Sequence, residues 1–164
     1  MNIDLYESAD DATLSEISRH AESLLASQLQ TAIAADQRAL TFSGLLVAGV
    51  AAIIAVAAGT SRPALPLVLM ATLLGLAAVC SLWSARPTRW FFVGTAPVNW
   101  EADLTDPEKT LRRSKAEMVA HYDSGLYQNA EAIRHAAWAM RSALVLTGAA
   151  LWVAIIWAWA QALR

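Results

Sequence analysis

The chain has few side chains that could do chemistry, and their spacing argues against catalysis. His121 and His135 are fourteen residues apart on one predicted helix. They share a helix face, but more than two turns separate them, which is too far for one metal ion. Cys80 is the single cysteine and has no partner thiol. A glycine-rich phosphate loop, an HExxH motif and a nucleophile elbow are all absent from the sequence, so we expect a non-enzyme without a metal site.

Ligand binding is the chemistry that residues 85–105 and the following helix could support. Prolines and a glycine interrupt this stretch, which predicts a loop. Its aromatic rings could stack on a nucleobase for about 1–3 kcal/mol per base, and nearby arginines suit a phosphate group. The other interpretation is a segment folded back on the membrane interface or the cytosolic helices, with a solvated, salt-bridged basic cluster. The candidate ligand-binding residues are Arg89, Trp90, Phe92, Trp100, Arg112 and Arg113.

Three uncharged runs make up much of the remaining chain. They cover residues 39–59, 64–84 and 142–163, and each matches the roughly 20 residues that cross a bilayer as a helix. Only residues 60–63 connect the first two runs. A composition that is 57% hydrophobic and 16% charged is too apolar for an ordinary soluble domain. The sequence therefore predicts three transmembrane helices within a single integral-membrane domain, residues 1–164. The net charge of −2 argues against a nucleic-acid partner.

Two further helices would position the candidate ligand residues. Residues 10–38 contain neither glycine nor proline and have an amphipathic pattern that runs into the first span. Residues 106–141, opened by a proline-containing helix start, predict a long helix that continues into the third span. Both helices lead toward the membrane, so they can pack in parallel. The fold class is therefore an all-α membrane protein with a cytosolic helical bundle.

The long helix carries a stripe that should face a neighbouring helix. Its apolar residues recur with heptad-like spacing, while Gly125 just before the stripe predicts a kink or hinge. The residues of this stripe are Leu126, Ala130, Ile133, Ala137, Met140 and Leu144.

The spans carry a packing signal but no transport signal. In the first span, Gly44, Ala48 and Ala52 recur at every fourth position, and such small residues let helix backbones approach closely. The partner is either another span of the same chain or a second copy of it. The spans contain no charged residue, which argues against ion-coupled transport.

The distribution of basic residues predicts the orientation of the chain. Two polar stretches, residues 1–38 and 85–141, flank the uncharged runs. All lysines and arginines except Arg62 and Arg164 lie in these stretches. The positive-inside rule places those stretches in the cytoplasm. The N-terminus is then cytoplasmic and the C-terminus lies outside.

Several short motifs resemble a known family in their order along the chain. Asp36-Gln37-Arg38-Ala39 leads into the first span, and Trp90-Phe91-Phe92 and Gly94 follow the second span. In the long helix, Tyr127-Gln128-Asn129 is a weaker match. This arrangement resembles the PycTM-type transmembrane domain of Pycsar effectors in bacterial anti-phage defence. Arg38 stands where that family more often has lysine, which keeps the charge. The family-motif positions are Asp36, Gln37, Arg38, Phe91 and Gly94.

The resemblance implies a multi-pass effector of the bacterial inner membrane. A cytosolic cyclic pyrimidine nucleotide, made by a partner nucleotide cyclase, would trigger it to oligomerise or rearrange and to impair membrane integrity. Its other partners would be the lipid bilayer and further copies of itself. The alternative is a non-enzymatic membrane adaptor or structural subunit that binds a protein partner through its cytosolic helices.

Overall fold

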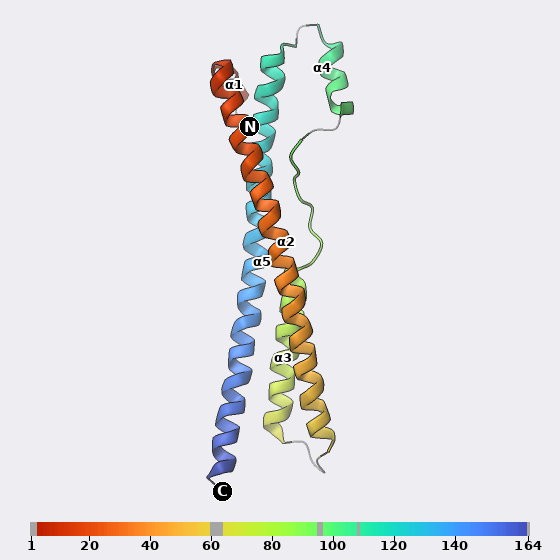
Figure 1. Cartoon of the computed structure of the whole chain (residues 1–164), viewed down its shortest axis with the longest axis vertical. Coiled ribbons are helices and arrows are strands. Elements are labelled where there is room, and N and C mark those ends of the chain that lie inside the picture. Colours follow the sequence, from red (N-terminus) through yellow and green to blue (C-terminus); the bar gives the residue numbers. More distant parts are fainter. Residues whose placement is uncertain (1–2, 60–63, 95–96, 108, 164) are drawn as a thin grey trace. The chain divides into compact units, whose positions relative to one another are not determined.

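The computed structural model describes residues 3–59, 64–94, 97–107 and 109–163. Within these ranges it contains helices and no strand. Three helices are long and apolar enough to cross a membrane, which confirms an all-α fold with three candidate spans. The predicted turn at residues 60–63 lies outside the described residues. The elements, shown in Figure 1, are α1 (Ile3–Glu7), α2 (Asp11–Ala58), α3 (Leu65–Ser84), η1 (Pro97–Trp100), α4 (Glu101–Thr105) and α5 (Leu111–Ala162).

The start of α2 follows from the side chain of Asp10. Its carboxylate accepts hydrogen bonds from the backbone N–H of Thr13 at 2.9 Å and of Ala12 at 3.0 Å. These are N-cap bonds to donors that the first helical turn leaves unpaired. Because they favour the charged form, led by the Thr13 backbone bond, the pKa of Asp10 is lowered. From there α2 continues without a break to Ala58, as its sequence predicts.

The start of α5 differs from the prediction. Asp106 and Pro107 are not helical, Glu108 lies outside the described residues, and α5 begins at Leu111. Asp106 has φ −90° and ψ 107°, because a residue that precedes proline is driven toward an extended conformation. Pro107 therefore follows the end of α4 and does not open α5. Part of the predicted loop, residues 97–105, is helical as η1 and α4.

The chain separates into two compact units, each made of two stretches of sequence. Unit 1 comprises Met1–Ile33 and Thr88–Ile133, and unit 2 comprises Ala34–Pro87 and Arg134–Arg164. The helices α2 and α5 contribute residues to both units without a break in either helix.

In unit 1 the helices α2 and α5 run in the same direction. Leu14 packs against Val119, and further along both helices Leu25 packs against Tyr122. All four side chains are at most 2% exposed. α1 adds Ile3 to the first of these clusters. Unit 1 thus has two apolar clusters along the contact between two parallel helices.

In unit 2 the helix α3 runs antiparallel to both α2 and α5. Its core consists of Leu46 on α2, Ala77 and Ala78 on α3, and Ala143 on α5. Three of these four residues are alanines, so the helix backbones approach closely, as is common where helices pack in lipid.

The buried face of α5 lies beside the predicted stripe and does not coincide with it. Ala130, Ala137 and Leu144 of the stripe are exposed, whereas Leu126, Ile133 and Met140 are partly buried. The inward positions recur every seven residues and hold mainly small or polar side chains. They are Tyr122, Asn129, Ala136, Ala143 and Ala150, of which all but the half-buried Ala136 are fully buried.

Candidate functional site

The segment that follows α3 is fixed to unit 1 through Asn129. The backbone N–H of Phe91 donates to Asn129 Oδ1 at 2.9 Å, and Asn129 Nδ2 donates to the Phe91 carbonyl at 3.0 Å. Asn129 is 0% exposed and sits at one of the inward positions of α5. A carboxamide offers both a donor and an acceptor, so it can pair with both backbone groups of one residue as a neighbouring strand would. Asn129 therefore holds the main chain of the segment at one point.

The side chain of Phe91 packs against Gly125 of α5, where the helix has no side chain. A Cβ atom at Gly125 would lie 2.3 Å from Phe91 Cδ1, so only glycine leaves room for the ring. The ring also makes edge-on contacts with His121 and Tyr122, with centroid separations of 5.0 and 6.5 Å. α5 is helical throughout this region. Gly125 thus permits a close approach, and the helix continues through it; the predicted kink or hinge at this residue stays a prediction.

A buried tyrosine completes this contact. The Tyr122 hydroxyl donates to Glu22 Oε1 on α2 at 3.4 Å. Burial disfavours the phenolate and raises the pKa of Tyr122, and the charge of Glu22 acts in the same direction. A backbone hydrogen bond from Gly94 opposes this shift. Gly94 has φ 91°, a left-handed conformation that suits glycine.

We define Phe91, His121, Tyr122, Gly125 and Asn129 as the Phe91 dock. It joins the segment of residues 88–93 to α5 and, through Glu22, to α2. Three members, His121, Tyr122 and Asn129, have side chains able to form hydrogen bonds. No three His, Cys, Asp or Glu side chains in the described ranges form a metal-binding group. The arrangement suits conformational coupling between a loop and two helices.

Of the predicted aromatic ligand residues, Trp90 and Phe92 flank Phe91 in the sequence, and Trp100 is the last residue of η1. Trp90 and Trp100 are half-buried, while Arg89 is exposed and Phe92 is 61% exposed. Among the described residues, no hydrogen bond, ion pair or ring contact joins these four to Arg112 or Arg113. The structure thus places the aromatic and basic halves of the predicted site in the same unit without linking them.

Arg112 and Arg113 are already engaged with the N-terminal segment. The Arg112 guanidinium lies 3.9 Å from Asp11 and donates to the carbonyl of Ala9. Arg113 lies 3.9 Å from Glu7 of that segment and 3.5 Å from Glu117, one turn further along α5. A phosphate group bound here would compete with these acceptors.

A second ion cluster attaches α4 to the start of α5. Lys109 Nζ lies 2.5 Å from Asp103 Oδ1 and 2.7 Å from Glu117 Oε2. The hydrogen bond to Asp103 is the main cause of a raised pKa at Lys109, and the same bond lowers the pKa of Asp103. Exposed pairs contribute little on their own, but here one ammonium group bridges two carboxylates.

The first family-motif positions lie in unit 2, on α2. Asp36 is partly buried, and desolvation raises its pKa, whereas Gln37 and Arg38 are exposed. Ala39 is 1% exposed, and its carbonyl accepts a 2.8 Å hydrogen bond from Ser81 on α3. This bond fixes the motif against the second candidate span.

A second serine of α3 makes the equivalent bond to α5. Ser84 Oγ donates to the Ala136 carbonyl at 2.9 Å. Ser81 and Ser84 are both buried and lie one helical turn apart. Each hydroxyl thus pairs with the backbone of a different neighbouring helix. The sequence analysis did not single out these serines. Two hydroxyl groups in an otherwise apolar run could have indicated hydrogen bonds to neighbouring helices.

The row of Gly44, Ala48 and Ala52 is exposed on α2. A Cβ atom at Gly44 would meet no atom within 4 Å. The neighbouring residue Ser43 and the inward Leu46 are the ones that are buried. The row therefore does not pack against the other described helices of this chain, and its contact with a second copy stays a prediction.

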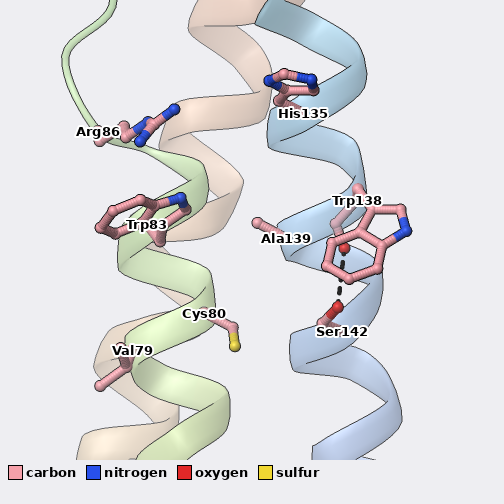
Figure 2. Close-up of a pocket in the computed structure, with 8 residues that line it drawn as sticks. All are labelled: Val79, Cys80, Trp83, Arg86, His135, Trp138, Ala139 and Ser142. Atoms are coloured by element: carbon pink, nitrogen blue, oxygen red, sulfur yellow. Dashed lines mark hydrogen bonds between the residues drawn. The ribbon is translucent and has the colours of Figure 1, made fainter.

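A groove lies between α3 and α5 in unit 2, with a volume of about 430 Å³. Figure 2 shows Arg86 and His135 at one end of it, on opposite walls, and Trp83 and Trp138 below them. The Arg86 guanidinium carbon lies 4.6 Å from the centre of the Trp83 ring. The residues of this α3–α5 groove are Val79, Cys80, Trp83, Arg86, His135, Trp138, Ala139 and Ser142.

Comparison of the chain with models of known families, with curated proteins and with solved structures finds no significant match.

Proposed function

We propose that the chain is an effector of bacterial anti-phage defence that acts at the inner membrane, with its N-terminus in the cytoplasm and its C-terminus outside. A cytosolic cyclic pyrimidine nucleotide would cause it to oligomerise or rearrange and so impair the membrane. The observation that carries this proposal is the continuity of α2 and α5, each of which extends from the paired helices of unit 1 into an apolar run. A change in pairing within unit 1 would thus act on the same helices that cross the bilayer.

The ion pairs of unit 1 indicate how a nucleotide could produce such a change. A phosphate that takes Arg112 and Arg113 would displace Asp11 and Glu7, the acceptors contributed by the N-terminal segment. Arginine offers a phosphate bidentate bonds that a single carboxylate oxygen at 3.9 Å does not match. The base would stack on the aromatic residues Trp90, Phe92 or Trp100. Binding would therefore loosen α1 and the start of α2 from α5.

The decisive experiment measures membrane permeability in bacteria that express the chain. Entry of a membrane-impermeant dye should rise when a pyrimidine nucleotide cyclase is co-expressed and should stay low with an inactive cyclase. Replacing both Arg112 and Arg113 by glutamine should abolish the rise. Arg141→Gln is the matched control, because Arg141 is an exposed arginine of the same helix outside unit 1. Dye entry that is independent of the cyclase would contradict the proposal.

A membrane adaptor is the second candidate, favoured by exposed apolar side chains on unit 1. Leu104 is 82% exposed and Leu111 is 65% exposed, and neither lies in an apolar run. Exposed apolar groups of this kind mark protein contacts when they cluster. A stable complex with another protein after purification, together with no permeability under any nucleotide, would favour this function over the effector.

A further inference from the structure

We propose that the α3–α5 groove binds one anionic phospholipid, with its phosphate at Arg86 and an acyl chain along the apolar walls. This goes beyond the proposed function and requires only that the chain resides in a bilayer. A failed nucleotide response would therefore leave it standing, and its own failure would leave the nucleotide response standing.

The charged end of the groove supplies the headgroup site. Arg86 follows the last turn of α3, two residues after the apolar run ends at Ser84. The salt bridges among the described residues do not include Arg86. Its guanidinium stacks on Trp83, which fixes its plane while leaving its N–H groups available to a phosphate. His135 faces it from α5, as Figure 2 shows, and adds a second polar ring at the same end.

The remainder of the groove suits a hydrocarbon chain. Below the charged end, Val79, Cys80 and Ala139 present apolar or weakly polar surfaces. A volume of about 430 Å³ falls in the range of roughly 300–1,000 Å³ that ligand pockets occupy. Trp83 and Trp138, both more than half exposed, line the groove near the end of the second apolar run and the start of the third. Tryptophan is enriched near the ends of membrane spans.

Charge complementarity selects an anionic headgroup over a zwitterionic one. The residues that line the groove include a guanidinium but no carboxylate. The phosphate of any phospholipid could bind Arg86. The ammonium group of a zwitterionic lipid would then lie near the Arg86 guanidinium, and the residues that line the groove offer it no carboxylate. Basic pockets between transmembrane helices at the cytoplasmic side bind anionic lipids for this reason.

Quenching of tryptophan fluorescence by brominated lipids tests the selectivity. The purified chain is placed in phosphatidylcholine vesicles, and phosphatidylglycerol with brominated acyl chains is added. Brominated phosphatidylglycerol should quench at lower mole fraction than brominated phosphatidylcholine, and Trp138→Phe should remove part of the difference. Arg86→Gln should reduce the preference about fivefold, in line with one arginine near an anionic lipid. Arg86→Lys should retain part of it, and Arg141→Gln should retain most of it.

Alkylation of Cys80 gives a second measurement that does not depend on fluorescence. Cys80 is the single cysteine of the chain and lines the groove, so a membrane-permeant maleimide reports on this place alone. Phosphatidylglycerol should slow its reaction in the unmodified chain but not in Arg86→Gln. Circular dichroism checks that each variant keeps its helix content.

Three results would overturn the proposal. Equal quenching by the two lipids would show that the groove does not select charge. Equal losses in Arg86→Gln and Arg141→Gln would indicate a diffuse basic surface. Protection of Cys80 that follows the protein-to-lipid ratio, whatever the lipid, would show that a second copy of the chain occupies the groove.

Discussion

The side-chain amide of Asn129 pairs with both backbone groups of Phe91, which lies 38 residues earlier in the chain. This pairing gives the connection after α3 a defined position on α5. Replacing Asn129 by leucine would leave both Phe91 groups without a partner, at a cost of about 1–3 kcal/mol for each group that stays buried. We expect the Phe91 amide to lose its protection from hydrogen exchange. Gln128→Leu is the control, since Gln128 is exposed and bonds only to Ser124 of its own helix.

Gly125 sets the distance between Phe91 and α5. Gly125→Ala would place a methyl group within 2.3 Å of the ring, and such overpacking costs about 1–3 kcal/mol. The thermal midpoint should fall. Gly148→Ala should raise it or leave it unchanged, because its Cβ would meet nothing within 4 Å and alanine favours helix. If the strain lies in this contact, adding Phe91→Leu should restore part of the stability of Gly125→Ala; no rescue would contradict the assignment.

Tyr122 makes the stability of unit 1 sensitive to alkaline pH. Its pKa is raised in the folded state, mainly by burial. The contribution of the neutral hydroxyl is therefore complete below the unfolded pKa of about 10 and is lost as pH rises toward the higher folded pKa. Thermal melts above about pH 10 should show a steeper loss in the unmodified chain than in Tyr122→Phe. Tyr127→Phe, at a 70% exposed tyrosine, should behave like the unmodified chain.

The Lys109 cluster should hold α4 in place across the neutral range and release it in acid. Asp103 has a lowered pKa, so its contribution is present above the unfolded value of about 3.9 and disappears as pH falls through the folded value. Lys109→Met should speed hydrogen exchange in residues 101–105 at neutral pH, where the unmodified chain is protected. Lys115→Met should not, because the contact of Lys115 within the described part of the chain is a 3.5 Å hydrogen bond to the Ser15 hydroxyl on α2. Equal effects of both substitutions would assign the attachment to general charge.

The sequence predicts the long helices well because their signals are local. Apolar runs fix α3 and the second halves of α2 and α5, and the lack of glycine and proline before Gly44 explains why α2 continues into its apolar run. The start of α5 was harder to predict, because Pro107 suits both the first turn of a helix and the position after one. The extended conformation of Asp106 decides between them.

The inward face of α5 could not be read from hydrophobicity alone. Where a helix crosses a bilayer, a large apolar side chain gains little by turning inward, and small residues such as Ala143 allow close contact between helices. The Phe91 dock could not be predicted from local sequence either, because it pairs a loop residue with a polar helix residue far along the chain. Asn129 lies seven residues from both Tyr122 and Ala136, and this spacing could have indicated that it shares their inward face of α5.

The division into two interrupted units has a consequence for biosynthesis. Ser15 and Lys115, which meet in unit 1, are separated by 100 residues of chain. The N-terminal part of α2 therefore leaves the ribosome without its partner, and residues 34–87 are translated before that partner exists. During this interval Leu14 and Leu25 are exposed. A nascent chain stalled before residue 111 should accordingly bind a chaperone that recognises apolar segments, and one stalled late enough for residues 111–133 to have left the ribosome should not.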